Sequence, residues 1–180
     1  MLAPTEIDHS GWCSGAVRVT SPNFDSRPGG SLVELIVIHA ISLPPGQFGG
    51  EAVEQLFTNS LDPNVHPYFA EINALRVSAH FFIRRGGELL QFVSCNDRAW
   101  HAGVSCWQAR ERCNDFSIGI ELEGDDETKF EEAQYHVLNE LIAGLRRAFP
   151  IVDVVGHCDI APGRKTDPGS GFDWHRVRQS

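Results

Sequence analysis

Two histidines and one aspartate have residue types and positions suited to holding a metal ion. His39 closes the apolar run IVIH, His157 closes the run VVGH, and Asp167 follows in the loop GHCDIAPGRKTDPG. Side chains at the ends of packed strands can converge on one point while the strands hold them rigid. Two imidazoles and a carboxylate, with a fourth position left to water, form a ligand set typical of catalytic zinc. Taken singly, each histidine is more often a hydrogen-bonded structural residue, so the prediction of a zinc site depends on the set.

Glu121 and Lys165 could supply catalysis beside such an ion. Glu121 lies on the polar face of the alternating run FSIGIELEG, and a carboxylate there could remove a proton from water and return it to a leaving amine. Lys165 lies close to Asp167 in the same loop and could stabilise a developing oxyanion. Alternatives remain open at this point. A solvated edge strand would explain Glu121 and its neighbour Glu123 equally well, and most lysines are simply solvated.

His80 and His101 are rival metal ligands. Period-two counting places His80 within a strand on the face of Phe82, which favours a buried, hydrogen-bonded histidine over a ligand. His101, in the motif WHAG, stays open. Cys158 adjoins His157, but neighbouring strand residues point to opposite faces, so it is a poor fourth ligand.

The elements that must position these residues alternate between strand and helix patterns. Capping by Thr128 and Glu131, followed by apolar residues at helical spacing up to Pro150, predicts one long helix. Gly86 and Gly87 are expected to supply positive φ angles in a tight hairpin. The expected strands and hairpin cover 32–39 (ending at His39), 76–93, 116–124 and 151–157, with a closing helix over 172–179. This order predicts an α/β (α+β) fold with a central mixed sheet flanked by helices.

Composition limits the classes of function. The 180 residues fit one domain, 1–180, and a net charge of −9 argues against nucleic-acid binding, which needs a surplus of Lys and Arg. No apolar run approaches the length of a membrane span. The start, MLAPTEIDHSGW, lacks the basic and apolar regions of a secretion signal, so we expect a cytoplasmic protein. The five cysteines are scattered, which favours reduced thiols over a disulfide framework.

Several long motifs resemble those of one enzyme family. They include ISLPPGQFGG, VSAHFFIRRGGELLQFV, RAWHAGVSCW and GHCDIAPGRKTDPGSGFDW. With them, the chain resembles the zinc-dependent N-acetylmuramoyl-L-alanine amidases, whose fold is also that of the peptidoglycan-recognition proteins. The resemblance implies one zinc ion bound by His39, His157 and Asp167, Glu121 as base and proton shuttle, Lys165 stabilising the tetrahedral intermediate, and Arg76, Trp100 and Arg112 holding the substrate.

The resemblance also implies a substrate and a cellular role. The expected reaction is hydrolysis of the amide between 1,6-anhydro-N-acetylmuramic acid and the L-alanine of a stem peptide, in cell-wall recycling, with an effect on β-lactamase induction where that circuit exists. Two positions depart from relatives. Ala79 stands where many related amidases carry tyrosine, and Ala40 where similar sequences have asparagine. The alternatives are a peptidoglycan-recognition module that binds without cutting and a zinc peptidase with another bond preference.

Overall fold

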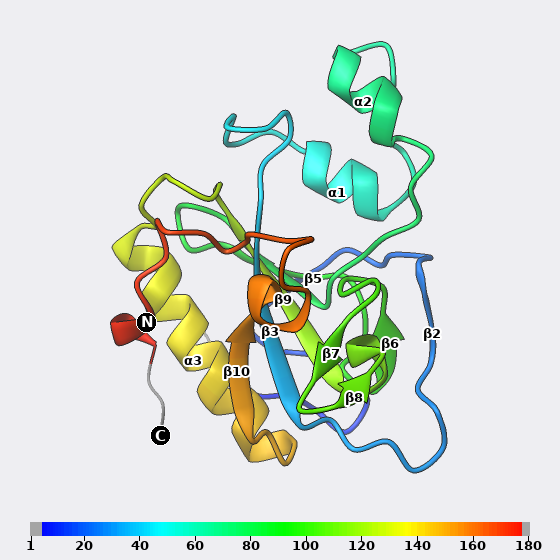
Figure 1. The fold of residues 1–180 in the computed structure, drawn as a ribbon, viewed down its shortest axis with the longest axis vertical. Helices are drawn as coiled ribbons and strands as arrows, with labels where there is room; N and C mark the ends of the chain where they lie inside the picture. The colour runs from blue at the N-terminus through cyan, green and yellow to red at the C-terminus, as the bar shows by residue number, and fades with distance from the viewer. Residues whose placement is uncertain (1–4, 178–180) are drawn as a thin grey trace.

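The computed structural model describes residues 5–177, and a six-stranded mixed sheet lies at their centre (Figure 1). The strand order is β1-β5-β4-β9-β3-β10, and β4 and β5 are the antiparallel pair among otherwise parallel neighbours. The bounds are β1 Val17–Arg18, β5 Leu89–Gln91, β4 Phe81–Ile83, β9 Ser117–Glu123, β3 Leu35–Ile41 and β10 Asp153–Gly156. The expected mixed sheet is confirmed.

Helix α3 (Glu132–Ala148) covers one face of this sheet (Figure 1). Its apolar side packs on alternate residues of the central strands, including Ile38 and Ile120. Burial of each such side chain stabilises the fold by about 1.5–3 kcal/mol, so this layer fixes the orientation of the strands. The helix begins later than expected, because the capping box is formed by Glu131 and Gln134. The sequence prediction of Thr128 in that role is wrong, since Thr128 instead donates to the Asp125 side chain.

The two central strands differ in detail from the sequence prediction. His39 does not end its strand, because β3 stays paired with β9 as far as Ile41 and Glu123. All seven residues of β9 are buried, since the strand lies between β4 and β3 in the interior of the sheet. A solvated edge strand is therefore excluded as the explanation for Glu121.

The expected hairpin is present but shorter than 76–93. Strands β4 and β5 are joined by a turn in which Gly87 has a φ of 86°. Gly86 does not share that positive φ, so the prediction holds for one glycine of the pair. The remaining residues of the expected segment continue as irregular chain.

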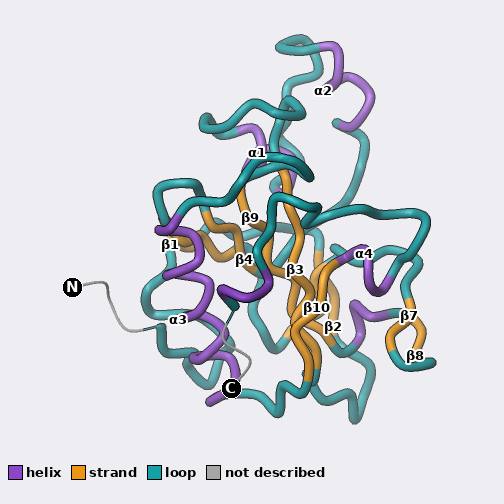
Figure 2. Tube along the Cα trace, turned by 60° about the vertical axis from the view of Figure 1, so that its left-hand side comes forward, coloured by secondary structure: helices purple, strands orange, loops and turns teal. Residues whose placement is uncertain are grey.

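The second face of the sheet is covered by connections instead of a long helix. A projecting arm between β3 and β4 contains α1 (Ala52–Phe57) and α2 (Pro67–Ile72), at the top of Figures 1 and 2. Phe57 packs edge-on against Phe92, with 5.1 Å between ring centroids, and joins the arm to the sheet. The segment between β5 and β9 forms further short elements. Strand β6 (Asp97–Ala99) pairs with β2 (Phe24–Ser26), and β7 (Cys106–Trp107) pairs with β8 (Arg110–Glu111), followed by the 3-10 turn η1 (Cys113–Asp115).

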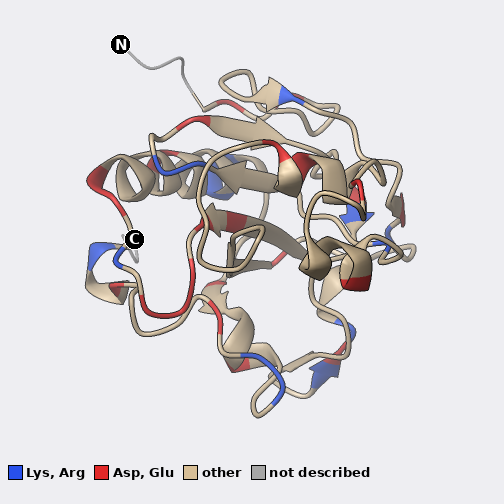
Figure 3. Ribbon diagram, turned by 90° about the horizontal axis from the view of Figure 1, so that it is seen from above, with Lys and Arg blue, Asp and Glu red and all other residues tan. Residues whose placement is uncertain are grey.

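The last part of the chain returns to the carboxyl ends of the central strands. Helix α4 (His157–Ile160) follows β10 directly, and a 3-10 turn, η2 (Trp174–Arg176), replaces the longer helix expected over 172–179. Residues 178 and 179 of the expected helix lie outside the described part of the chain. Residues 1–4 of the segment MLAPTEIDHSGW lie outside it as well. Among the described residues no helix is long and apolar enough to cross a membrane. Lys and Arg are dispersed among acidic residues along the ribbon (Figure 3).

Candidate metal centre and active site

Three side chains from distant parts of the sequence point their donor atoms at one another. His39 Nδ1 lies 3.0 Å from His157 Nδ1 and 3.2 Å from Asp167 Oδ2, and the third side of this triangle measures 3.1 Å. A tetrahedral ion with bonds of about 2.0 Å has edges of about 3.3 Å between its ligand atoms. The three donors could therefore hold a metal ion, and they form the one such group of His, Cys, Asp and Glu found within residues 5–177.

Strand register explains why the two histidines meet. Gly156 of β10 pairs with Ile38 of β3 in the parallel ladder, so His157 and His39 come next at the same level. Asp167 reaches them from the loop, whose backbone is tied back where Cys158 N donates to Asp167 O at 3.0 Å. The loop thus returns to the two histidines and brings the Asp167 carboxylate to them.

The protonation states of His39 and Asp167 suit metal binding. Burial lowers the pKa of His39 to about 4. Burial alone would raise the pKa of Asp167, but hydrogen bonds with His157 and His39 outweigh it and lower that pKa. His39 is thus neutral and Asp167 ionised at neutral pH, which are the forms in which imidazole and carboxylate bind metals.

Glu121 lies next to His39, as its register partner on β9. The side chain is 9% exposed, and its Oε2 is a buried oxygen with no hydrogen-bond partner in the described structure. Burial, reinforced by the negative charge of Asp167, raises the pKa of Glu121 well above its ordinary value, while Lys165 acts in the opposite direction. A buried carboxyl group with a raised proton affinity and an unpaired oxygen is suited to accepting and returning a proton.

These residues line a cavity of about 660 Å³ with two dissimilar walls. One wall is acidic and polar, and Lys165 and Ala40 lie on the lining, where Ala40 offers only a methyl group. The other wall is mostly apolar and comes largely from the arm. Its residues are Leu43, Leu56, Phe57, Tyr68, Ile72, Leu75, Val77 and Trp100. The cavity is large enough to hold a sugar ring or a short peptide. The metal ligands alone would not distinguish between such substrates, so the rest of the lining must do so.

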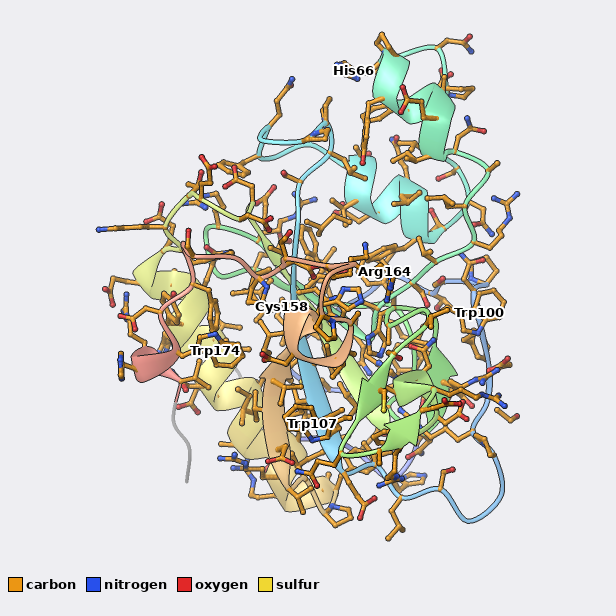
Figure 4. All side chains as sticks on the ribbon, in the orientation of Figure 1. His66, Trp100, Trp107, Cys158, Arg164 and Trp174 are labelled. Carbon is orange, nitrogen blue, oxygen red and sulfur yellow. The ribbon has the colours of Figure 1, made fainter. Side chains whose placement is uncertain are left out.

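The three residues expected to hold substrate lie in different places. Trp100, labelled in Figure 4, lines the cavity. Arg76 is exposed beside it and donates to the carbonyls of Asn73 and Leu75, without being part of the lining. Arg112 contributes to a separate cavity of about 530 Å³ and pairs with Asp115. The structure therefore brings Trp100 to the metal centre and leaves both guanidinium groups outside the lining.

The rival histidines are not members of the donor group. His80 is fully buried, and its Nδ1 accepts a hydrogen bond from Gly119 N while its Nε2 lies 3.1 Å from Asp97 O. His80 is thus a hydrogen-bonded structural histidine. His101 instead approaches His39 from the ring edge opposite the three donors, with Nδ1 at 2.9 Å from His39 Nε2. Nothing in the local sequence indicated that contact, because it joins residues far apart in the chain.

Glu123, which the sequence left equivalent to Glu121, has a different environment. Its carboxylate accepts hydrogen bonds from Gly49 N at 2.5 Å and Arg85 N at 3.0 Å. The bond from Gly49 fastens the loop that leads into the arm, and the bond from Arg85 holds the turn between β4 and β5. Glu123 thus has both oxygens engaged, while Glu121 keeps one unpaired.

Comparison with known proteins adds a decisive observation. The model of the N-acetylmuramoyl-L-alanine amidase family matches residues 29–170. The chain belongs to this family. It is 56% identical over 170 residues to the 1,6-anhydro-N-acetylmuramyl-L-alanine amidase AmpD of Escherichia coli, covering 93% of each protein. The expected family and the expectation of an amidase are thereby confirmed.

Solved structures of this amidase family agree with the fold. A crystal structure of a selenomethionine derivative of AmpD superposes with a TM-score of 0.91 at 56% identity, over 93% of this chain and 94% of that one. The amidase AmiD of Escherichia coli, solved with anhydro-N-acetylmuramic acid-L-Ala-D-γ-Glu-L-Lys, gives 0.59 at 28% identity, over 83% and 58%. The fold is also that of a Drosophila peptidoglycan recognition protein, with a TM-score of 0.59 at 18% identity over 91% and 98% of the two chains.

Proposed function

We propose that the chain hydrolyses the amide bond between 1,6-anhydro-N-acetylmuramic acid and the L-alanine of a stem peptide. The observation that carries the proposal is the triangle of His39, His157 and Asp167 donors beside the unpaired oxygen of Glu121. Similarity to AmpD over most of the chain supports the choice of bond and sugar.

The metal in this proposal is one zinc ion per chain. Two nitrogens and one oxygen, spaced for a small tetrahedral ion, form a three-ligand set of the kind that catalytic zinc uses. When bound, zinc supplies Lewis acidity and lowers the pKa of a coordinated water. His39, His157 and Asp167 are the residues that would hold it.

Glu121 and Lys165 carry the proton and charge chemistry. Glu121 takes the proton of the attacking water on its unpaired Oε2 and later gives a proton to the departing L-alanine amine. Burial raises the pKa of the carboxyl group, which makes the ionised form a stronger base toward the attacking water. Lys165, which lines the same cavity, stabilises negative charge on the former carbonyl oxygen.

The cavity walls divide the work of holding the substrate. Trp100 and the apolar arm offer a surface for the sugar ring, whose faces are largely C–H. Arg76 and Arg112 would reach from the surrounding surface to carboxylates of the stem peptide. Solved complexes show that the related amidase AmiD and an AmpDh3 of Pseudomonas aeruginosa bind anhydromuramyl peptides.

This activity belongs to peptidoglycan recycling. A small released muropeptide is the proposed substrate, and we propose that the chain meets it in the cytoplasm. In bacteria with a muropeptide-sensing circuit, its removal would lower β-lactamase induction. Cell fractionation followed by detection of the protein tests the location.

Mass spectrometry of the products from a defined anhydro-muropeptide tests the function. We expect anhydro-N-acetylmuramic acid with a newly released lactyl carboxylate, and the stem peptide with a free L-alanine amine. Chelation should stop the reaction and added zinc should restore it. Binding without products would favour a recognition module, and cleavage inside the peptide would favour a peptidase; either result would overturn the proposal.

A further inference from the structure

We propose that His101 is a positioning residue that fixes the metal-binding tautomer of His39. The inference rests on the proposed metal role of His39, but it concerns a residue outside the donor triangle. It follows from a chain of hydrogen bonds that runs from His39 through His101 and Ser117 to a backbone carbonyl.

The distances define an unbroken chain. His39 Nε2 lies 2.9 Å from His101 Nδ1, and His101 Nε2 lies 3.3 Å from Ser117 Oγ. Ser117 Oγ in turn donates to Cys113 O at 2.6 Å. Each imidazole thus uses one nitrogen toward each neighbour, so the position of one proton determines the next.

The direction of the chain is set at its far end. A carbonyl oxygen only accepts, so the Ser117 hydroxyl must donate to Cys113 O and is left to accept from His101 Nε2–H. A neutral His101 then has a bare Nδ1, which must accept from His39 Nε2–H. The remaining lone pair of His39 is therefore on Nδ1, the atom that faces His157 and Asp167. The protein selects the ligand tautomer before any metal arrives.

The fold reserves space for this ring. A Cβ added at Gly119 would lie 2.4 Å from Cγ of His101, so the neighbouring strand accepts the imidazole only because residue 119 has no side chain. Asn114 Oδ1 accepts from the backbone N–H groups of His101 and Ala102, at 3.2 and 2.8 Å. These contacts hold the segment from both sides and leave the ring edge-on to His39, at 87° and 5.0 Å between centroids.

The same segment orients the second histidine of the triangle. His157 Nε2 lies 3.1 Å from Ala102 O, which fixes the proton on Nε2 and leaves Nδ1 bare. Arg164, labelled in Figure 4, also donates to Ala102 O, at 2.8 Å. Two consecutive residues, one through its side chain and one through its carbonyl, therefore set the tautomers of both imidazole ligands. Partners of this kind tune metal affinity by about 10- to 100-fold.

The test compares three variants in zinc binding and in the His39 tautomer. His101→Leu fills the site without an acceptor, and His101→Asn keeps an acceptor oxygen near the Nδ1 position. Ser117→Ala leaves His101 in place and removes only the group that orders its proton. Zinc affinity is measured by competition with a chromophoric chelator. The tautomer of His39 is read from imidazole ¹⁵N shifts of the metal-free protein.

We expect His101→Leu to bind zinc about 10- to 100-fold more weakly, with partial rescue in His101→Asn. Ser117→Ala should bind zinc more weakly than wild type and show mixed Nδ1–H and Nε2–H signals for His39. His136→Asn is the control, because His136 is an exposed histidine of α3 that lies outside the cavity lining. It should leave both readouts unchanged.

Specific outcomes overturn the inference. The inference is wrong if Ser117→Ala binds zinc with wild-type affinity and its ¹⁵N shifts show a single His39 tautomer. This result is informative even if His101→Leu fails to fold. Equal loss in His101→Leu and His101→Asn, with the His39 tautomer unchanged, would leave His101 only a packing role. Failure of the wild-type protein to bind zinc would instead reject the proposed function, which keeps the two results distinct.

Discussion

His39 and Glu121 are register partners on adjacent parallel strands and project from the same sheet face. His157 reaches the same level from the strand on the other side of β3. Three neighbouring strands therefore deliver two donors and one carboxyl group to one point without any adjustment by flexible loops. Because the arrangement is rigid, a substitution at one of these positions can change catalysis without changing metal binding.

Glu121→Gln should retain zinc and lose turnover, because the amide keeps the shape of the side chain but cannot carry the proton. We expect kcat to fall by about 10²- to 10⁴-fold, measured by product release from an anhydro-muropeptide. Burial raises the pKa of Glu121, so ionisation of this group lowers the stability of the metal-free protein as pH rises through that pKa. The Glu121→Gln variant has no ionisable group there and should not lose this stability. Near wild-type turnover would contradict the proton role.

Lys165→Met should lower kcat while leaving zinc affinity unchanged. The substitution keeps an unbranched chain in the cavity and removes the charge that stabilises the oxyanion, an effect worth about 10²- to 10³-fold in kcat. Lys129→Met, at an exposed position outside the cavity lining, is the control. A loss confined to KM would show that Lys165 binds substrate instead of the transition state.

Removal of the metal should lower thermal stability. A ligand at about 1,000 times its Kd stabilises a native protein by about 4 kcal/mol, or about 10 °C in a chain of this size. Calorimetry with and without chelator measures the difference. Asp167→Asn weakens one ligand of the triangle, so its melting temperature should respond far less to zinc. An equal response in both proteins would place the metal elsewhere.

Gly169→Ala should disturb the loop that carries Asp167. Gly169 has a φ of 79°, and an added Cβ would lie 2.2 Å from Cα of Asp126. We expect at least a tenfold loss of zinc affinity because the loop must move. Gly163→Ala is the matched control, since Gly163 has a similar φ of 77° but open space around it, and should cost only about 1–2 kcal/mol of stability. Equal zinc affinity in both variants would contradict the loop argument.

His80 should make the metal-free protein sensitive to acid. Burial lowers its pKa from 6.5 to about 3, so the unfolded chain takes up a proton below pH 6.5 that the native protein refuses. Stability from this group is present above pH 6.5 and is lost as pH falls toward 3, at about 1.4 kcal/mol per pH unit. Urea unfolding of wild type and His80→Asn across pH 4–7 measures it. Parallel slopes would contradict the argument.

Local sequence patterns predicted the parts of the fold that depend on short-range order. The apolar spacing of α3 and the alternation in β9 were readable because each element buries one face against the same core. The meeting of His39 and His157 was also predictable, since two apolar runs ending in histidine place them at one sheet edge.

The remaining features depend on contacts between distant segments. The arm and the loops around His101 decide whether the polar face of β9 contacts water or protein. The sequence of β9 itself does not indicate that these segments cover it. The contact of His101 with His39 and the different partners of Glu121 and Glu123 arise in the same way. The capping residue was misassigned because Asp125 competes for Thr128.

The arm between β3 and β4 leaves from one central strand and returns to another, yet contributes none of the three donors. Insertions, deletions or exchanges within 42–78 could therefore reshape what the cavity admits while the ion-binding triangle stays as it is. In related proteins, substrate selectivity could therefore change through the arm while the residues that cleave the bond stay the same.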